Sequence, residues 1–107
     1  PQIWYLDLFA GKNDHEAVQR AGESGHKEIN RTNLSTDQIT EGLKKDVVQK
    51  QLALIRMRNT HKAFSEGAEV AISGGERSLE IRWEYNSAFA TLYVNFESGT
   101  YTIVESR

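Results

Sequence analysis

The sequence predicts an α+β fold, in which helices come first along the chain and strands come last. Three observations lead to this class. An apolar segment lies at residues 3–6, apolar residues recur at helical spacing through residues 47–59, and four segments with a repeat of about two follow Gly67. Helices and strands that are segregated along the chain are typical of α+β proteins. We therefore expect a module boundary near Gly67, between residues 1–66 and residues 67–107.

The first predicted element is a strand. Residues 3–6 are apolar at successive positions. Such a run suits a strand that is buried on both faces, as the interior strands of parallel sheets are. Asp7 interrupts the run, and a turn cluster of Gly, Asn and Asp follows within residues 11–14. These signals predict a parallel, interior strand at residues 3–6, which Asp7 ends.

Two short helices and a loop follow. Residues 15–21 can form a helix, which the glycines after it interrupt, and residues 22–33 are predicted to be a long polar loop. Ser35 or Thr36 can then cap a second short helix that Gly42 weakens or ends.

The longest predicted helix spans residues 47–59. Its apolar side chains lie within one broad arc at about 100° per residue. Asp46 stands where a carboxylate favours a helix N-terminus, and Arg56 and Arg58 stand in the last turns, where the helix dipole favours cations. The apolar arc consists of Val47, Val48, Leu52, Leu54 and Ile55.

The last third of the chain predicts an antiparallel meander. Apolar and polar residues alternate there, as in strands with one buried face. The predicted strands are residues 69–72, 78–85, 90–96 and 100–104. The turn residues that separate them are Gly74-Gly75, Asn86-Ser87 and Ser98-Gly99.

The composition excludes several classes of protein. Lys and Arg total 13 against 15 Asp and Glu, a net charge of -2, so no basic surface favours nucleic acid or an anionic membrane as a partner. The absence of cysteine excludes disulfides and is compatible with a reducing cytoplasm. No apolar run approaches the ~20 residues of a membrane span. Because the chain opens at Pro1 without a methionine, we expect a piece of a longer protein.

Isolated polar residues give little evidence of catalysis. Neither a facing pair of carboxylates nor a nucleophile elbow can be identified. Asp7 and Asp14 flank the end of the predicted strand, where they either line a pocket or serve only as turn residues. His15, His26 and His61 lack the spacing of metal ligands, so we expect neither a metal nor another cofactor.

Residues 25–31 are the densest polar cluster, and they include His26, Lys27, Glu28 and Arg31. A glycine-flexed loop of this kind can hold an anion or a sugar hydroxyl. The alternative is a solvated loop in which Glu28 pairs with Lys27 or Arg31.

Aromatic residues of the predicted sheet allow two interpretations. They either form a platform on which a sugar stacks or pack in the core. Trp83 shares one face with Leu79 and Ile81, which favours packing. The aromatic set is Trp83, Tyr85, Tyr93 and Tyr101.

Two segments together resemble a known family. Residues 1–14, PQIWYLDLFAGKND, and residues 25–31, GHKEINR, are similar to the C-terminal part of sucrose phosphorylases of the α-amylase clan. The resemblance covers residues 1–72 and extends more loosely through the remainder. It implies the last strand of a TIM barrel at residues 3–7, its long loop to about residue 33 and the last barrel helix at residues 47–59. A small antiparallel β domain would follow from residue 67.

The resemblance also implies an activity. The parent enzyme would transfer glucose from sucrose, or a related α-glucoside such as sucrose 6'-phosphate, to inorganic phosphate with retention of configuration. The family's catalytic carboxylates lie on earlier barrel strands, so this chain is expected to hold no catalytic residue and to be inactive alone. The expected partner is the rest of the parent barrel. Homodimers are known in the family, although no residue here argues for one.

Substrate-binding roles follow from the same resemblance for Lys27, His26, Arg31 and Asp7. Many members of the family have an arginine at the position of Lys27, where it contacts the glucosyl unit. Lysine lacks the planar fork of arginine. The substitution leaves room for relatives that act on sucrose 6'-phosphate, glucosylglycerol or glucosylglycerate.

Two other functions stay open. The first is an α-glucosidase-type hydrolase of the same clan, in which water takes the place of phosphate. The second is a non-catalytic carbohydrate-binding or interaction module.

Overall fold

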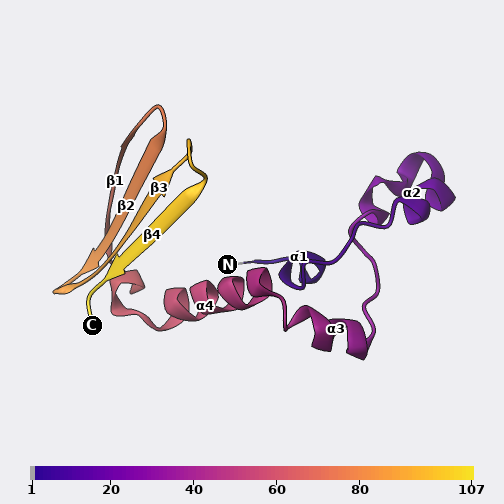
Figure 1. Ribbon diagram of the computed structural model, residues 1–107, viewed down its shortest axis with the longest axis horizontal. Coiled ribbons are helices and arrows are strands. Elements are labelled where there is room, and N and C mark those ends of the chain that lie inside the picture. Colours follow the sequence, from indigo (N-terminus) through magenta and orange to yellow (C-terminus); the bar gives the residue numbers. More distant parts are fainter. Residues whose placement is uncertain (1) are drawn as a thin grey trace. The chain divides into compact units, whose positions relative to one another are not determined.

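The computed structural model describes residues 2–107, so the expectation that concerns Pro1 lies outside the described residues. The chain forms two compact units, one up to Ile55 and one from Arg56 onward. Helices make up the first unit, and a four-stranded antiparallel sheet dominates the second (Figure 1). The predicted α+β class is thereby confirmed.

The first unit is built from short helices around a small core. Leu6 and Val48 are buried side chains of this unit. Its elements are α1 (Tyr5–Leu8), α2 (His15–Ala21), the 3-10 helix η1 (Gly22–Glu28), α3 (Thr36–Gly42) and the larger part of α4 (Asp46–Thr60).

The strand predicted at residues 3–7 is wrong. Trp4 has an extended backbone, with φ -70° and ψ 133°, but residues 5–8 form α1, in which the Leu8 N–H donates to the Trp4 carbonyl at 3.0 Å. A parallel strand needs neighbouring strands to accept and donate its hydrogen bonds. All four strands of the described chain lie after residue 68, in the antiparallel sheet. Local helical hydrogen bonds satisfy the backbone instead.

The other helices form largely where the sequence predicts them. α2 matches residues 15–21, and α4 extends the predicted 47–59 by one residue at each end. The polar loop predicted at residues 22–33 is partly wrong, because its first half forms the 3-10 helix η1.

Ser35 is the residue that caps α3. Its hydroxyl accepts a hydrogen bond from the Gln38 N–H at 3.2 Å, and the Gln38 side chain accepts one from the Ser35 N–H at 2.8 Å. This reciprocal pair is a capping box, which satisfies two backbone donors at the start of the helix. The prediction of a capped helix here is confirmed.

The second unit contains the predicted meander. Each strand is antiparallel to the next, in the order β1-β2-β3-β4 (Figure 1). Gly74 and Gly75 differ from the prediction, since they pair with β2 and the turn comes after them. The strands are β1 (Glu69–Gly75), β2 (Ser78–Tyr85), β3 (Ala88–Asn95) and β4 (Thr100–Glu105).

The register sorts side chains onto two unlike faces of the sheet, because successive residues of a strand point to opposite sides. Cross-strand partners share a face. The face defined here as apolar carries the rows Val70-Trp83-Ala90 and Ile72-Ile81-Leu92-Ile103. The face defined here as polar carries the rows Ala71-Arg82-Thr91-Val104 and Ser73-Glu80-Tyr93-Thr102.

A short 3-10 helix, η2 (Lys62–Phe64), covers one end of the apolar face. The Phe64 ring lies 5.2 Å from the Trp83 ring, centroid to centroid, and Ala63 and Ala90 are buried. Trp83 therefore packs in the core, as its spacing predicts.

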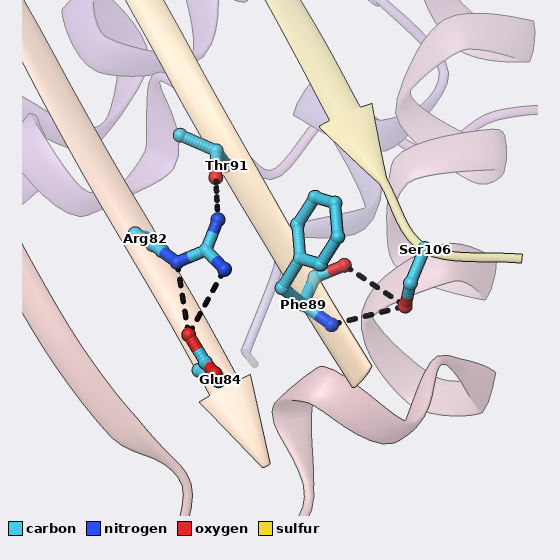
Figure 2. Close-up of polar contacts among 5 residues, drawn as sticks. All are labelled: Arg82, Glu84, Phe89, Thr91 and Ser106. Atoms are coloured by element: carbon cyan, nitrogen blue, oxygen red, sulfur yellow. Dashed lines mark hydrogen bonds and ion pairs between the residues drawn. The ribbon is translucent and has the colours of Figure 1, made fainter. Parts of the chain in front are cut away.

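The C-terminal tail is fastened at two points. The Nδ1 of His61 accepts from the Ala63 N–H at 3.2 Å, so its Nε2 carries the hydrogen and donates to the Ser106 carbonyl at 2.9 Å. The Ser106 hydroxyl in turn accepts from the Phe89 N–H at 3.0 Å (Figure 2). These bonds close the open end of the meander.

On the polar face, Arg82 forms a clamp across two strands (Figure 2). Its Nη2 and Nε lie 2.9 and 3.0 Å from one oxygen of Glu84, and its Nη1 donates to the Thr91 hydroxyl at 3.2 Å. The guanidinium lies 4.4 Å from the centroid of the Phe89 ring. Thr91 is buried beneath this cluster, with 1% of its surface exposed.

Candidate functional site

The polar cluster at residues 25–31 begins in η1, which packs closely against α2. Gly25 is buried, and a Cβ placed on it would lie 2.5 Å from the Val18 carbonyl oxygen. That distance is too short for any side chain, so the backbone approach requires glycine. Gly25 therefore fixes where the rest of the loop starts.

The side chains of Trp4 and Tyr5 hold the far end of the loop. The indole Nε1 of Trp4 donates to the Asn30 carbonyl at 2.6 Å, and the Tyr5 hydroxyl donates to the Thr32 carbonyl. Both contacts join residues more than twenty-five positions apart in sequence. The segment predicted as a strand therefore positions the loop through the hydrogen-bonding atoms of its side chains.

A second set of bonds joins the loop to residues 12–14. The Asp14 N–H donates to the Ile29 carbonyl at 2.8 Å, and the Thr32 hydroxyl donates to the Lys12 carbonyl at 3.2 Å. The loop is therefore held along its length by backbone carbonyls, which leaves its charged side chains free to face solvent.

Three of the four predicted binding residues lie on this loop and are exposed: His26, Lys27 and Arg31. The Nη1 of Arg31 lies 3.1 Å from the Glu28 carboxylate, so one of the pairings expected of a solvated loop is present. Neither His26 nor Lys27 forms a side-chain hydrogen bond or ion pair within residues 2–107. The Lys27 ammonium is available to a ligand.

Asp7, the fourth predicted residue, lies on α1. Its side chain is exposed, and its carbonyl accepts hydrogen bonds from the Ala10 N–H at 3.0 Å and the Gln51 amide at 3.4 Å. Within the part of the chain that the structure describes, no hydrogen bond or ion pair joins its carboxylate to the loop. The structure therefore does not bring Asp7 together with the other three.

Asp14 has a structural role. One carboxylate oxygen accepts from the Ala17 N–H at 2.8 Å and caps α2, and the other lies 3.6 Å from Arg20. Of its two readings, the turn and capping interpretation is the one the structure supports.

A cavity of about 320 Å³ lies beside the loop and involves residues that sequence reasoning missed. Its lining includes Lys12, Thr32 and Lys45. The Lys45 ammonium is engaged, since it donates to the Ala10 carbonyl at 2.8 Å. Lys12 and Lys45 are far apart in sequence, and no local pattern links them. The only sequence feature that pointed to this cavity was the position of Lys12 directly after Gly11.

The arrangement is suited to binding rather than to catalysis. Exposed cations and hydroxyls can hold an anion or sugar hydroxyls. Among the described residues, no group of three or more His, Cys, Asp or Glu side chains could hold a metal ion. No described helix is long and apolar enough to cross a bilayer.

Comparison with known proteins gives consistent relatives, although no family model matches the chain. Sucrose 6(F)-phosphate phosphorylase of Ilumatobacter coccineus is 48% identical over 103 residues, which are 96% of this chain and 20% of that protein. Sucrose phosphorylase of Agrobacterium vitis is 38% identical over 106 residues, which are 99% of this chain and 21% of that protein.

A solved structure agrees with these relatives. The crystal structure of sucrose 6F-phosphate phosphorylase from Thermoanaerobacter thermosaccharolyticum matches the whole chain with a TM-score of 0.88 at 35% identity, and the match covers 21% of that chain. The similarity to these proteins extends over nearly every residue of this chain. The chain belongs to the sucrose phosphorylase family and spans about one fifth of the length of the relatives it matches.

Proposed function

We propose that the chain is the C-terminal part of a retaining glycoside phosphorylase. The parent transfers glucose from sucrose, or a related α-glucoside such as sucrose 6'-phosphate, to inorganic phosphate and yields glucose 1-phosphate. The supporting observation is similarity over nearly the whole chain to phosphorylases named for sucrose and its 6(F)-phosphate. In this assignment residues 1–66 belong to a TIM-barrel catalytic domain and residues 67–107 form a C-terminal β domain.

The reaction is a double displacement. A carboxylate of the parent attacks the anomeric carbon, the bond to the leaving sugar breaks, and a β-glucosyl ester forms. A phosphate oxygen then displaces the carboxylate, which restores the α configuration. We assign no catalytic residue to this chain, and we propose that it is inactive by itself.

The proposed contribution of this chain is one wall of the substrate site. Lys27 carries a compact point charge on a flexible stem, which suits a phosphate group better than the paired hydroxyls that an arginine fork holds. His26 and Arg31 flank it on the same loop. The assignment of Asp7 to substrate binding rests on the family resemblance alone.

Exposed apolar side chains support the rest of the parent protein as the partner. Ile3 is 40% exposed, Val70 52% and Ile72 68%. Apolar surface of this kind is normally covered by another part of the chain or by a partner. We propose that the remaining chain of the parent covers it. A homodimer of the parent rests on the resemblance alone.

The proposed compartment is the cytoplasm, which the absence of cysteine supports. A net charge of -2 favours neither nucleic acid nor an anionic membrane as a partner.

The test uses the longer parent protein. Sucrose, sucrose 6'-phosphate and glucosylglycerol are supplied in turn, each with and without inorganic phosphate, and glucose 1-phosphate and free glucose are measured. We expect release of glucose 1-phosphate that depends on phosphate from one donor. Free glucose that is independent of phosphate would assign the α-glucosidase-type hydrolase. Lack of turnover of every donor would favour the non-catalytic carbohydrate-binding or interaction module.

A further inference from the structure

The polar face of the sheet carries a row of four side chains, one from each strand. Ser73 pairs with Glu80, Glu80 with Tyr93, and Tyr93 with Thr102. Directly opposed side chains in antiparallel strands have their Cβ atoms about 4.5–5.5 Å apart. A hydroxyl, a carboxylate, a phenol and a second hydroxyl therefore form one line across the sheet.

This row lines a groove of about 280 Å³. Ser78, Asn95 and Thr100 also line it, and they form the next row on the same face. The lining further includes the whole row between the two, which consists of Gly74, Leu79, Val94 and Tyr101. A hollow on the polar face exposes the side chains of these two rows. Between them it exposes the backbone of the intervening row, whose side chains point to the other face.

The two rows differ in how their polar atoms are used. Ser78 and Asn95 accept hydrogen bonds from backbone N–H groups at the turns, and the Thr100 hydroxyl lies 2.7 Å from the Ser98 hydroxyl. No hydrogen bond or ion pair is formed between residues 2 and 107 by the side chains of the first row, Ser73, Glu80, Tyr93 and Thr102. Their donors and acceptors are available to a ligand.

The residue types in the free row match the chemistry of a sugar. Tyr93 is 44% exposed, and its ring combines an apolar face with a polar hydroxyl. A carboxylate such as that of Glu80 can accept hydrogen bonds from neighbouring hydroxyls, and serine and threonine both donate and accept. Sugar rings present apolar C–H faces and hydroxyl edges, so the row offers a partner for each.

The charge of the groove selects against anions. Glu80 is the one charged residue of the lining, and it is negative. The two arginines nearest along the chain are both paired, Arg77 with Glu97 at 2.8 Å and Arg82 with Glu84 at 2.9 Å. We propose that this groove is a binding site for neutral saccharides, in which Tyr93 stacks on the sugar ring and Glu80 accepts from its hydroxyls. The proposal does not depend on the phosphorylase assignment.

The experiment is saturation-transfer difference NMR on the 107-residue chain, under conditions in which its amide spectrum shows the folded sheet. The method observes the ligand and tolerates self-association of the protein. The probes are sucrose and sucrose 6'-phosphate, each up to about 50 mM, where a site with a Kd of a few millimolar would be nearly filled. We expect saturable transfer to sucrose and at least fivefold weaker binding of the phosphorylated sugar.

Variants then locate the site. Glu80→Gln, which preserves the shape of the side chain, and Tyr93→Ala should each weaken sucrose binding at least fivefold. Phe96→Ala is the matched control, because Phe96 is an aromatic residue of the same unit, is 59% exposed and does not line the groove. The proposal is overturned by absent transfer to sucrose, by equal binding of both sugars, or by a larger effect of Phe96→Ala than of Glu80→Gln.

Discussion

Trp4 and Tyr5 are aromatic residues whose role in the fold differs from the one that their apolar spacing predicts. The sequence counts both as apolar members of a strand, yet Trp4 is 41% and Tyr5 38% exposed. Their hydrogen-bonding atoms hold the loop that carries Lys27, through the Asn30 and Thr32 carbonyls. Aromatic residues with a polar tip can serve both purposes, and only tertiary contacts decide which one dominates.

A first prediction concerns Trp4→Phe, which keeps an aromatic ring and removes the bond to the Asn30 carbonyl. We expect a loss of about 0.5–1.5 kcal/mol of local stability, the usual net value of one hydrogen bond. Amide hydrogen exchange over residues 29–32 should become faster. Tyr93→Phe is the matched control, since it removes a hydroxyl that has no partner within the described residues. Unaltered exchange in the loop would contradict this role of Trp4.

A second prediction concerns Lys27 in the parent enzyme. Lys27→Ala should raise the KM for phosphate or for a phosphorylated donor about tenfold, the loss expected for a hydrogen bond to a charged group. Lys27→Arg should recover much of that loss and favour a donor without phosphate. Lys50→Ala changes another exposed lysine, on α4, and should have no effect. Phosphorolysis kinetics that are unchanged in Lys27→Ala would rule out a substrate contact.

Helices, strands and turns that depend on interactions between residues close in sequence could be predicted from the sequence. The alternation in β2, the turn after Tyr85 and the cap of α3 are local features. The prediction of a strand at residues 3–7 is wrong because a parallel strand needs neighbouring strands, and every strand of residues 2–107 lies in the antiparallel sheet. The groove beside Tyr93 was also beyond prediction, since it arises from the register of all four strands.

A third prediction concerns the cap of α3. Ser35→Ala removes the acceptor for the Gln38 N–H, and it should destabilise this helix by about 1 kcal/mol. Carbon chemical shifts over Thr36–Gly42 measure the loss of helix. Thr36→Ala is the control, because the Thr36 hydroxyl caps no backbone group in the described chain. Equal effects of the two changes would show that the capping box does not stabilise α3.

At the scale of the whole molecule, the chain exposes much apolar surface for its size. On the apolar face of the sheet, Val70, Ile72 and Tyr101 are each more than half exposed, and Ile3 adds a further exposed side chain in the first unit. The relatives are about five times as long as the chain, which supports the proposal that the rest of a longer parent covers these side chains.

A fourth prediction follows for the isolated chain, which should be marginally stable or self-associate. The double change Val70→Thr and Ile72→Thr keeps β-branched residues in β1 and should reduce association, as measured by analytical ultracentrifugation. Val104→Thr is the matched control, because Val104 is 47% exposed but lies on the polar face. A monodisperse monomer with a sharp cooperative melt would contradict this prediction.

We propose that this chain belongs to an enzyme that uses phosphate, not water, to cleave an α-glucoside. The most direct measurement is the anomeric product formed by the parent protein, followed by NMR with and without inorganic phosphate. We expect α-glucose 1-phosphate only when phosphate is present. Free glucose formed at the same rate without phosphate would contradict it.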